Sequence, residues 1–188
     1  MGKLRSALDE SAARFIEAQH IFFVASAPLD AAGHINLSPK GLDTFRILGP
    51  TTVAYLDFNG SGVETIAHLK ENGRIVLMFC AFQGPPNIFR LYGRGRVIEQ
   101  HDPKFAALIQ NFPVHEHSRS IIVVEVDRIS DSCGYGVPLF EYQGERRQLE
   151  LWAQKRGTEG LKAYREQKNR RSIDGLRGVS EFDRQEVG

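Results

Sequence analysis

The chain has 188 residues, of which 41% are hydrophobic and 10% aromatic, enough apolar surface for one domain with a packed core. Its 24 Lys and Arg residues nearly balance its 23 Asp and Glu residues, which argues against the global positive field typical of nucleic-acid-binding proteins. No run approaches the roughly 20 apolar residues of a membrane span, and residues 1–11 lack the apolar stretch of a signal peptide. These features predict a cytoplasmic protein without membrane association.

The N-terminal third is predicted to hold a helix and a hairpin. Apolar residues recur at helical spacing over residues 3–18, which predicts an amphipathic helix. A strand over 21–26, turn residues at 30–33 and a strand over 35–40 indicate a hairpin whose loop is longer than the tightest type. Residues two apart in a strand share a face, so one face of the second strand is polar, carrying His34, Asn36, Ser38 and Lys40.

The middle of the chain carries the strongest candidate for an anion site. A strand over 51–58 leads into Asn59-Gly60-Ser61-Gly62 and then a short helix that stops at Asn72-Gly73. Ser61 and Glu64 have the spacing of a capping box. Free N–H groups and the positive end of the helix dipole favour a phosphate at such a helix start. The predicted phosphate site comprises Asn59, Ser61, Gly62 and Thr65, and the alternative is that Ser61 only caps the helix.

Two further strands follow, one nearly all apolar over 74–82 and one alternating over 87–98. Arg90 stands between apolar neighbours, where a charge favours a fixed anionic partner. Gly93 and Gly95 share the opposite face and indicate a bend or the close approach of a neighbouring backbone. We expect pairing with a second copy of the chain to bury this glycine face.

The remaining residues are predicted to add a helix, a strand and a charged tail. Asp102-Pro103 begins a helix that reaches Phe112, and residues 120–129 form the sixth strand. His115-Glu116-His117 lacks a fourth ligand nearby, and Cys80 and Cys133 have no metal-ligand spacing, so no metal site is predicted. Residues 1–142 are expected to form the main domain, and the charged residues 143–188 a largely helical extension that packs on it or on a partner.

Four motifs in this order resemble a known family: Ser38-Pro39-Lys40-Gly41, Asn59-Gly60-Ser61-Gly62, Asn72-Gly73-Arg74 and Arg90-Leu91-Tyr92-Gly93-Arg94-Gly95. Residues 21–129 are similar to the FMN-binding split barrel of the pyridoxamine 5'-phosphate oxidase-like family. The resemblance implies a mainly β fold with flanking helices, built as a six-stranded antiparallel split β-barrel with a helical C-terminal tail.

The resemblance also implies a cofactor and a partner. It implies a homodimer that holds FMN at the subunit interface and acts as an oxidoreductase on a small-molecule substrate. Ser38 and Lys40 would run along the flavin, Asn59, Ser61, Gly62 and Thr65 would face its phosphate, and Lys40 or Arg90 would neutralise the charge. No catalytic side chain is implied. The Arg-Leu-x-Pro signature of true pyridoxamine phosphate oxidases is absent, since residues 174–177 read Asp-Gly-Leu-Arg, which disfavours vitamin B6 oxidation.

Four alternatives stay open from the sequence. The chain could be a non-catalytic flavin-binding protein, or a split barrel that takes haem or deazaflavin, although no lone histidine in an apolar strand suggests a haem ligand. It could bind nucleic acid through the basic residues 168–171, against which the near-zero net charge argues. It could also be a purely structural dimer.

Overall fold

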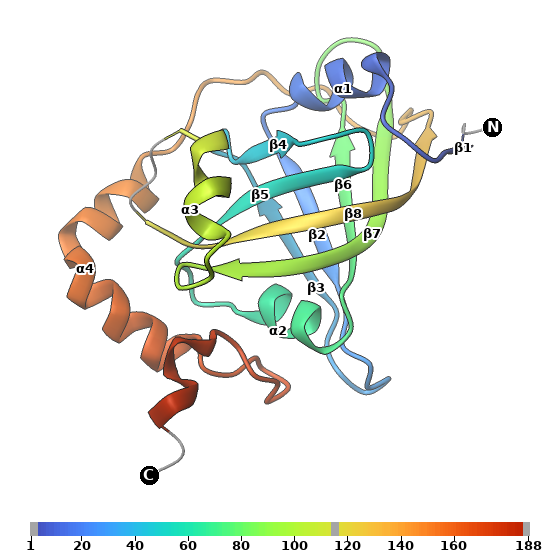
Figure 1. Cartoon of the computed structure of the whole chain (residues 1–188). Coiled ribbons are helices and arrows are strands. Elements are labelled where there is room, and N and C mark those ends of the chain that lie inside the picture. The colour runs from blue at the N-terminus through green and yellow to red at the C-terminus, as the bar shows by residue number, and fades with distance from the viewer. Residues whose placement is uncertain (1–3, 114–116, 186–188) are drawn as a thin grey trace.

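An antiparallel sheet curls around the interior of the molecule and closes it on several sides (Figure 1). The computed structural model describes residues 4–113 and 117–185. Within them the sheet has eight strands, in the order β3-β2-β6-β7-β8-β5-β4, with β1 paired to β8. The strands are β1 (Leu4–Arg5), β2 (Phe22–Ser26), β3 (Asn36–Lys40), β4 (Phe45–Ile47), β5 (Thr52–Phe58), β6 (Arg74–Cys80), β7 (Ile88–Glu99) and β8 (Ser118–Ser132).

The mainly β architecture with flanking helices is as predicted, but the expected number of six strands is wrong. All six expected strands are present, and β1 and β4 are the additional ones. These two strands have two and three residues, too few for an alternating pattern to be visible in the sequence. β2 and β3 form the predicted hairpin, in which Val24 pairs with Ser38.

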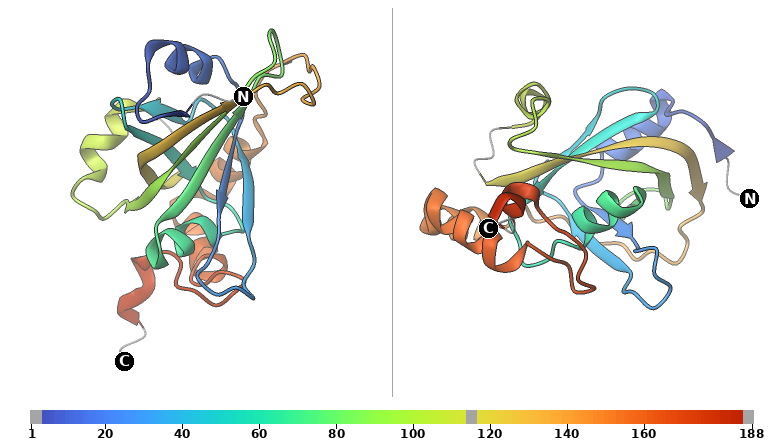
Figure 2. Two further views of the ribbon diagram at one scale, coloured as in Figure 1. Left: turned by 90° about the vertical axis from the view of Figure 1, so that its right-hand side faces the viewer. Right: turned by 60° about the horizontal axis from the view of Figure 1, so that its bottom comes forward.

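The helices flank this sheet at its two ends and on one side (Figures 1 and 2). They are α1 (Glu10–Glu17), α2 (Glu64–Glu71), α3 (Phe105–Leu108), the 3-10 turn η1 (Ile109–Asn111), α4 (Gln148–Lys168) and the 3-10 segment η2 (Ser180–Gln185). Among these described helices, none is both long enough and apolar enough to cross a lipid bilayer. α1 is shorter than predicted because the Asp9 carboxylate caps it by accepting from the N–H of Ala12 at 2.8 Å.

Two hydrophobic cores hold the elements together. The larger lies inside the curl, where Ile16 of α1 and Ile66 of α2 pack against residues from β2, β5, β6, β7 and β8. The smaller lies on the outer side of β5, β7 and β8 and is covered by α3 and η1. Val179 and Phe182 of the C-terminal tail belong to the larger core, so the tail packs on the sheet of its own chain.

The C-terminal helix contains a break that the sequence pattern does not reveal. Gly157 has a φ of 62° and a ψ of 178°, which separates α4 into two helical segments. This conformation is readily adopted by glycine because it has no Cβ. The second segment ends near the loop that follows β5, where the candidate site lies (Figure 2).

Gly93 explains why β7 and β8 can approach each other, and it corrects the expectation about the glycine face. A Cβ at Gly93 would overlap with the backbone carbonyl of Glu125, and one at Gly95 would contact the side chain of Leu69. Both glycines are therefore covered by their own chain, and the expectation that a second copy buries them is wrong. The predicted close approach of a neighbouring backbone is confirmed at Gly93.

We expect Gly93→Ala to lower the free energy of unfolding by about 1–3 kcal/mol, because the new methyl group must push β8 away from β7. Denaturant titration of the purified protein measures this change. Gly49→Ala is the matched control, since a Cβ at Gly49 would meet no atom within 4 Å. Equal stability of the two variants would contradict the explanation.

Candidate functional site

A pocket of about 250 Å³ lies where β3, the end of β5 and the beginning of α2 come together. Five of the seven predicted binding residues line it, namely Ser38, Lys40, Ser61, Gly62 and Thr65. The other lining residues are Asn36, Asp57, Phe58, Gly60, Glu64 and Arg119. The polar face of the second predicted strand and the loop after the third predicted strand therefore meet at one pocket.

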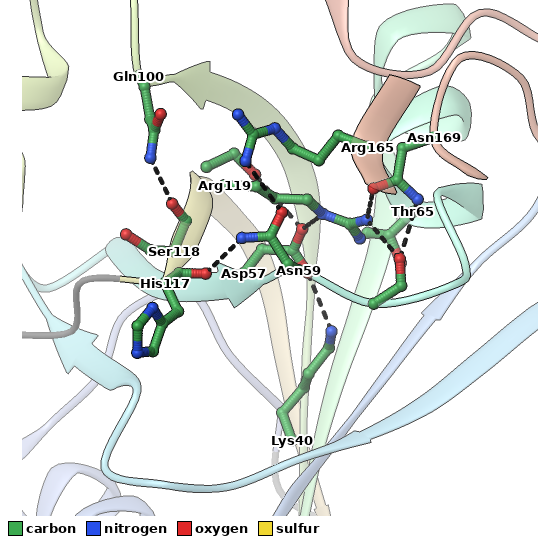
Figure 3. A network of polar contacts seen from close by, with 12 residues as sticks. Lys40, Asp57, Asn59, Thr65, Gln100, His117, Ser118, Arg119, Arg165 and Asn169 are labelled. Carbon is green, nitrogen blue, oxygen red and sulfur yellow. Dashed lines mark hydrogen bonds and ion pairs between the residues drawn. The ribbon is translucent and has the colours of Figure 1, made fainter. Parts of the chain in front are cut away.

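A buried carboxylate at the base of this site holds two positive charges in place (Figure 3). Asp57 is 1% exposed, and its Oδ2 accepts from Nε of Arg119 at 2.6 Å while its Oδ1 accepts from Nζ of Lys40 at 3.0 Å. Burial raises the pKa of the Asp57 carboxyl, but the attraction and hydrogen bonds of Arg119 and Lys40 outweigh it and lower this pKa to about 2. The carboxylate is therefore ionised at neutral pH.

The lowered pKa of Asp57 makes the free energy of unfolding depend on pH. The native pKa of about 2 lies below the ordinary aspartate pKa of 3.8, so the carboxylate contributes roughly 2 kcal/mol at neutral pH. This contribution is fully present above about pH 4 and is lost as the pH falls through about 2. We expect the gap in unfolding free energy between wild type and Asp57→Asn to shrink over this interval, and a constant gap would contradict the assignment.

The charges that line the pocket balance one another. Lys40 and Arg119 are positive, whereas Asp57 and Glu64 are negative. The lining therefore has no net charge to attract an anion, and anion binding depends on well-placed hydrogen-bond donors. Lys40 is the accessible cationic donor, since its side chain is 22% exposed while that of Arg119 is only 5% exposed.

The loop after β5 is held from two sides. The Asn59 side chain is buried next to the pocket, and its Nδ2 donates to the carbonyl of His117 at 2.8 Å. The carbonyl of Gly60 accepts from Nδ2 of Asn169 at 2.9 Å. Asn36 donates to Oγ1 of Thr65 at 2.9 Å, which connects β3 to α2 across the pocket. Asn59 and Thr65 thus take part in the framework of the site.

The predicted capping role of Ser61 is wrong. α2 begins at Glu64, its N-cap residue is Val63, and no side chain caps it. Ser61 lies exposed in the loop and lines the pocket. Glu64 leans over Gly62, since a Cβ there would lie 2.5 Å from its Oε2. Because this carboxylate repels anions, it disfavours an anion close to Gly62.

Arg90 does not join the other predicted residues. Phe89 and Leu91 point into the larger core, so the Arg90 side chain lies on the opposite face of the sheet. There its Nη1 donates to Oγ of Ser132 at 3.1 Å. Lys40 pairs along the sheet with Phe22, a core residue, and therefore lies on the inner face. Within one chain, Arg90 and Lys40 therefore do not share a pocket.

Sequence reasoning missed the arginine that the structure places in the pocket. Arg119 stands between two serines at the start of β8, and the second serine is followed by an apolar run; the Arg119 side chain is buried. A charge at the edge of a buried strand was a usable signal, because buried charges need partners. Asn169, which accepts from Nη1 of Arg119 at 2.9 Å, gives no such signal in the sequence.

The histidine-containing tripeptide can be placed only in part. His115 and Glu116 lie outside the described residues, and the backbone carbonyl of His117 accepts from Asn59. Within residues 4–113 and 117–185, no group of three His, Cys, Asp or Glu residues could hold a metal ion.

The curled antiparallel sheet, its flanking helices and the polar pocket at its side define a split β-barrel protein. Residues 8–133 match the family model of pyridoxamine 5'-phosphate oxidase. A pyridoxamine 5'-phosphate oxidase family protein of Aspergillus flavus, ustO, is 41% identical over 178 residues, covering 86% of this chain and 71% of that protein. The chain therefore belongs to the pyridoxamine 5'-phosphate oxidase family, as the motifs predicted.

Solved structures share the fold at low sequence identity. A tagged variant of HupZ from Group A Streptococcus has a TM-score of 0.53 and 22% identity, covering 66% of this chain and 98% of its own. A Lactobacillus delbrueckii protein, provisionally assigned as a pyridoxamine 5'-phosphate oxidase, has a TM-score of 0.51 and 16% identity, covering 66% of this chain and 94% of its own. These likenesses establish the split-barrel architecture.

Proposed function

We propose that the chain binds FMN, with the phosphate in the pocket beside β3, and works as a flavin-dependent oxidoreductase on a small-molecule substrate. The observation that carries the proposal is the accessible Lys40 ammonium in a pocket that Ser38 and Ser61 also line, in a member of this family. Charge-assisted hydrogen bonds from such donors are the strong contacts of a phosphate. Lys40, Ser38 and Ser61 would hold the phosphate oxygens.

The size and shape of the pocket favour the phosphate end of an elongated ligand. Its volume of about 250 Å³ is below the roughly 300–1,000 Å³ of sites that enclose a whole small molecule. Asn36, Ser38 and Lys40 lie on one face of β3, with successive side chains about 6.6 Å apart. A polyhydroxylated chain such as ribityl could run along this row, which leaves the flavin ring outside the pocket.

A second copy of the chain is proposed to cover the flavin ring. β3 is an edge strand, and its outward residue Leu37 and the preceding Ile35 are 63% and 78% exposed. Partly exposed apolar residues on β2 and β6 continue this surface, since Leu37 pairs with Ala25 and Ala25 with Val76. A continuous apolar surface of this kind favours association with another protein surface. Because Leu37 adjoins Ser38 in the strand, a copy seated there stands beside the pocket.

Arg90 keeps a candidate role only within such a homodimer. It lies on the same outer face, in the row formed by Pro39, Phe23 and Met78. A residue on this face is directed away from the pocket of its own chain. In a symmetric pair, it would be offered to the cofactor held by the other copy.

Bound FMN would supply the electron transfer, and the residues of the chain would bind and orient it. Lys40 would neutralise charge, and the hydroxyl groups of Ser38 and Ser61 would fix the phosphate. The buried Asp57 would keep the Lys40 ammonium in position through their 3.0 Å contact. No side-chain acid, base or nucleophile is assigned to the reaction.

The decisive experiment is to purify the protein and record its absorption spectrum. We expect a flavin spectrum, release of FMN on heating as identified by mass, a particle mass twice that of the chain, and bleaching by NADH or NADPH. If the protein is colourless, titration with FMN replaces the first measurement. A haem Soret band, or failure to bind FMN, would overturn the proposal, whereas bound FMN without bleaching by any donor would reduce it to flavin binding alone.

A further inference from the structure

The end of α4 reaches back to the rim of the pocket, although it is more than a hundred residues away from the pocket loop in the sequence. Asn169 follows the last turn of α4, caps it by donating its N–H to the carbonyl of Arg165, and is 0% exposed. A fully buried amide side chain must be satisfied by hydrogen bonds, because an unpaired one is costly. The hydrogen-bond partners of the Asn169 side chain therefore indicate its structural role.

Both ends of the Asn169 amide bind elements of the pocket (Figure 3). Its Nδ2 donates to the carbonyl of Gly60 at 2.9 Å, and its Oδ1 accepts from Nη1 of Arg119 at 2.9 Å. Arg119 in turn binds Asp57, and Asp57 binds Lys40. Polar contacts thus connect Lys40, at the pocket wall, through Asp57, Arg119 and Asn169 to Gly60, which also lines the pocket. Asn169 is the residue of this network that comes from the C-terminal tail.

A second contact from α4 supports the same loop. Nη1 of Arg165 donates to Oδ1 of Asn59 at 3.3 Å, while its other nitrogens bind Glu181 at 2.8 and 3.1 Å. The side chain of Asn59 and the carbonyl of Gly60 are consecutive groups in the loop. Both are bound by the C-terminal end of one helix, so the position of α4 contributes to the conformation of the loop.

The backbone of Asn169 is fixed by the chain that returns after a turn. Its carbonyl accepts from the N–H of Val179 at 2.9 Å. Gly178 packs so closely that a Cβ there would overlap with this carbonyl. A substitution at Gly178 can therefore displace Asn169 while leaving its side chain intact.

We propose that Asn169 is a positioning residue of the phosphate site, which fixes the Gly60 loop and the Arg119 guanidinium and thereby sets the preference for phosphorylated over unphosphorylated flavin. This inference rests on the proposed function. Asn169 does not line the pocket, so it acts through Gly60 and Arg119. Donors held in place before binding lose less conformational freedom when the phosphate arrives, which favours FMN over riboflavin.

The test compares the affinities of the full-length apoprotein for FMN and for riboflavin, which lacks the phosphate, by quenching of flavin fluorescence. We expect wild type to prefer FMN and Asn169→Ala to reduce that preference by about tenfold, through weaker FMN binding with riboflavin affinity unchanged. Gly178→Ala is expected to act in the same direction. Gln167→Ala, which removes an exposed side chain from the same helix turn, should leave the preference as in wild type.

The outcomes separate this inference from the proposed function. Asn169→Ala could keep the wild-type preference for FMN, or lower the affinities for FMN and riboflavin equally. In either case Asn169 is only structural, and the inference is overturned while flavin binding stands. If Asn169→Ala does not fold, Gly178→Ala decides by the same criterion. If wild type binds neither flavin, the proposed function fails and the inference fails with it.

Discussion

Replacing Arg119 with methionine is expected to lower the free energy of unfolding by about 3–5 kcal/mol, because it leaves the buried Asp57 carboxylate without its closest partner. The Lys40 ammonium remains, but it is partly exposed to solvent and binds only the other carboxylate oxygen. Oδ1 of Asn169 also loses its donor. Denaturant titration at neutral pH measures the change.

The cause of this loss can be separated from simple repacking by a double-mutant cycle. Adding Asp57→Asn to Arg119→Met removes the uncompensated charge, so we expect the double variant to be more stable than Arg119→Met alone. Asp57→Asn alone should be destabilised, because it leaves the Arg119 guanidinium unpaired. If the losses in unfolding free energy of the two single variants add up in the double variant, the ion pair is not the reason for the instability of Arg119→Met.

Replacing Lys40 with methionine is expected to weaken FMN binding by about 10- to 100-fold, which corresponds to the loss of one charge-assisted hydrogen bond. The charges that line the pocket then change from balanced to negative, since Asp57 and Glu64 face only Arg119. Riboflavin binding should change little because riboflavin has no phosphate. Methionine keeps much of the aliphatic length of lysine, which limits the loss of packing.

A matched control is Lys162→Met, an exposed lysine of α4 that does not line the pocket. It should bind both flavins as wild type does. Equal loss of FMN and riboflavin affinity in Lys40→Met would place the flavin ring rather than the phosphate at this residue. Unchanged affinity for FMN would exclude the pocket as the phosphate site.

The sequence predicted the strands and turns that depend on local patterns. Alternation over 35–40 and 87–98 marked β3 and β7, and the Asn-Gly pairs at 59–60 and 72–73 marked the loop after β5 and the end of α2. β1 and β4 escaped because pairs and triplets of residues carry no period. The predicted N-terminal helix is longer than α1, because the apolar spacing includes Leu4, which pairs with β8 instead.

The same distinction applies to the candidate site. Ser38 and Lys40 were found from their shared face, and Ser61 from its loop, all signals within a few residues of one another. Arg90 lies between apolar residues and Arg119 between two serines near an apolar run, and only the tertiary structure places the first on the outer face of the sheet and the second in the pocket. A composition or spacing rule cannot separate them.

The sequence by itself thus determined the six main strands and the two segments that form the pocket walls, since these follow from alternation and turn residues along the chain, and four motifs indicated the family by their resemblance to it. Only the tertiary structure decided which charges meet there. The bond from Arg119 to Asp57 joins residues 62 apart, and that from Asn169 to Gly60 joins residues 109 apart. Such contacts depend on the curl of the sheet and on the returning tail, and neither leaves a periodic signal in the amino-acid sequence.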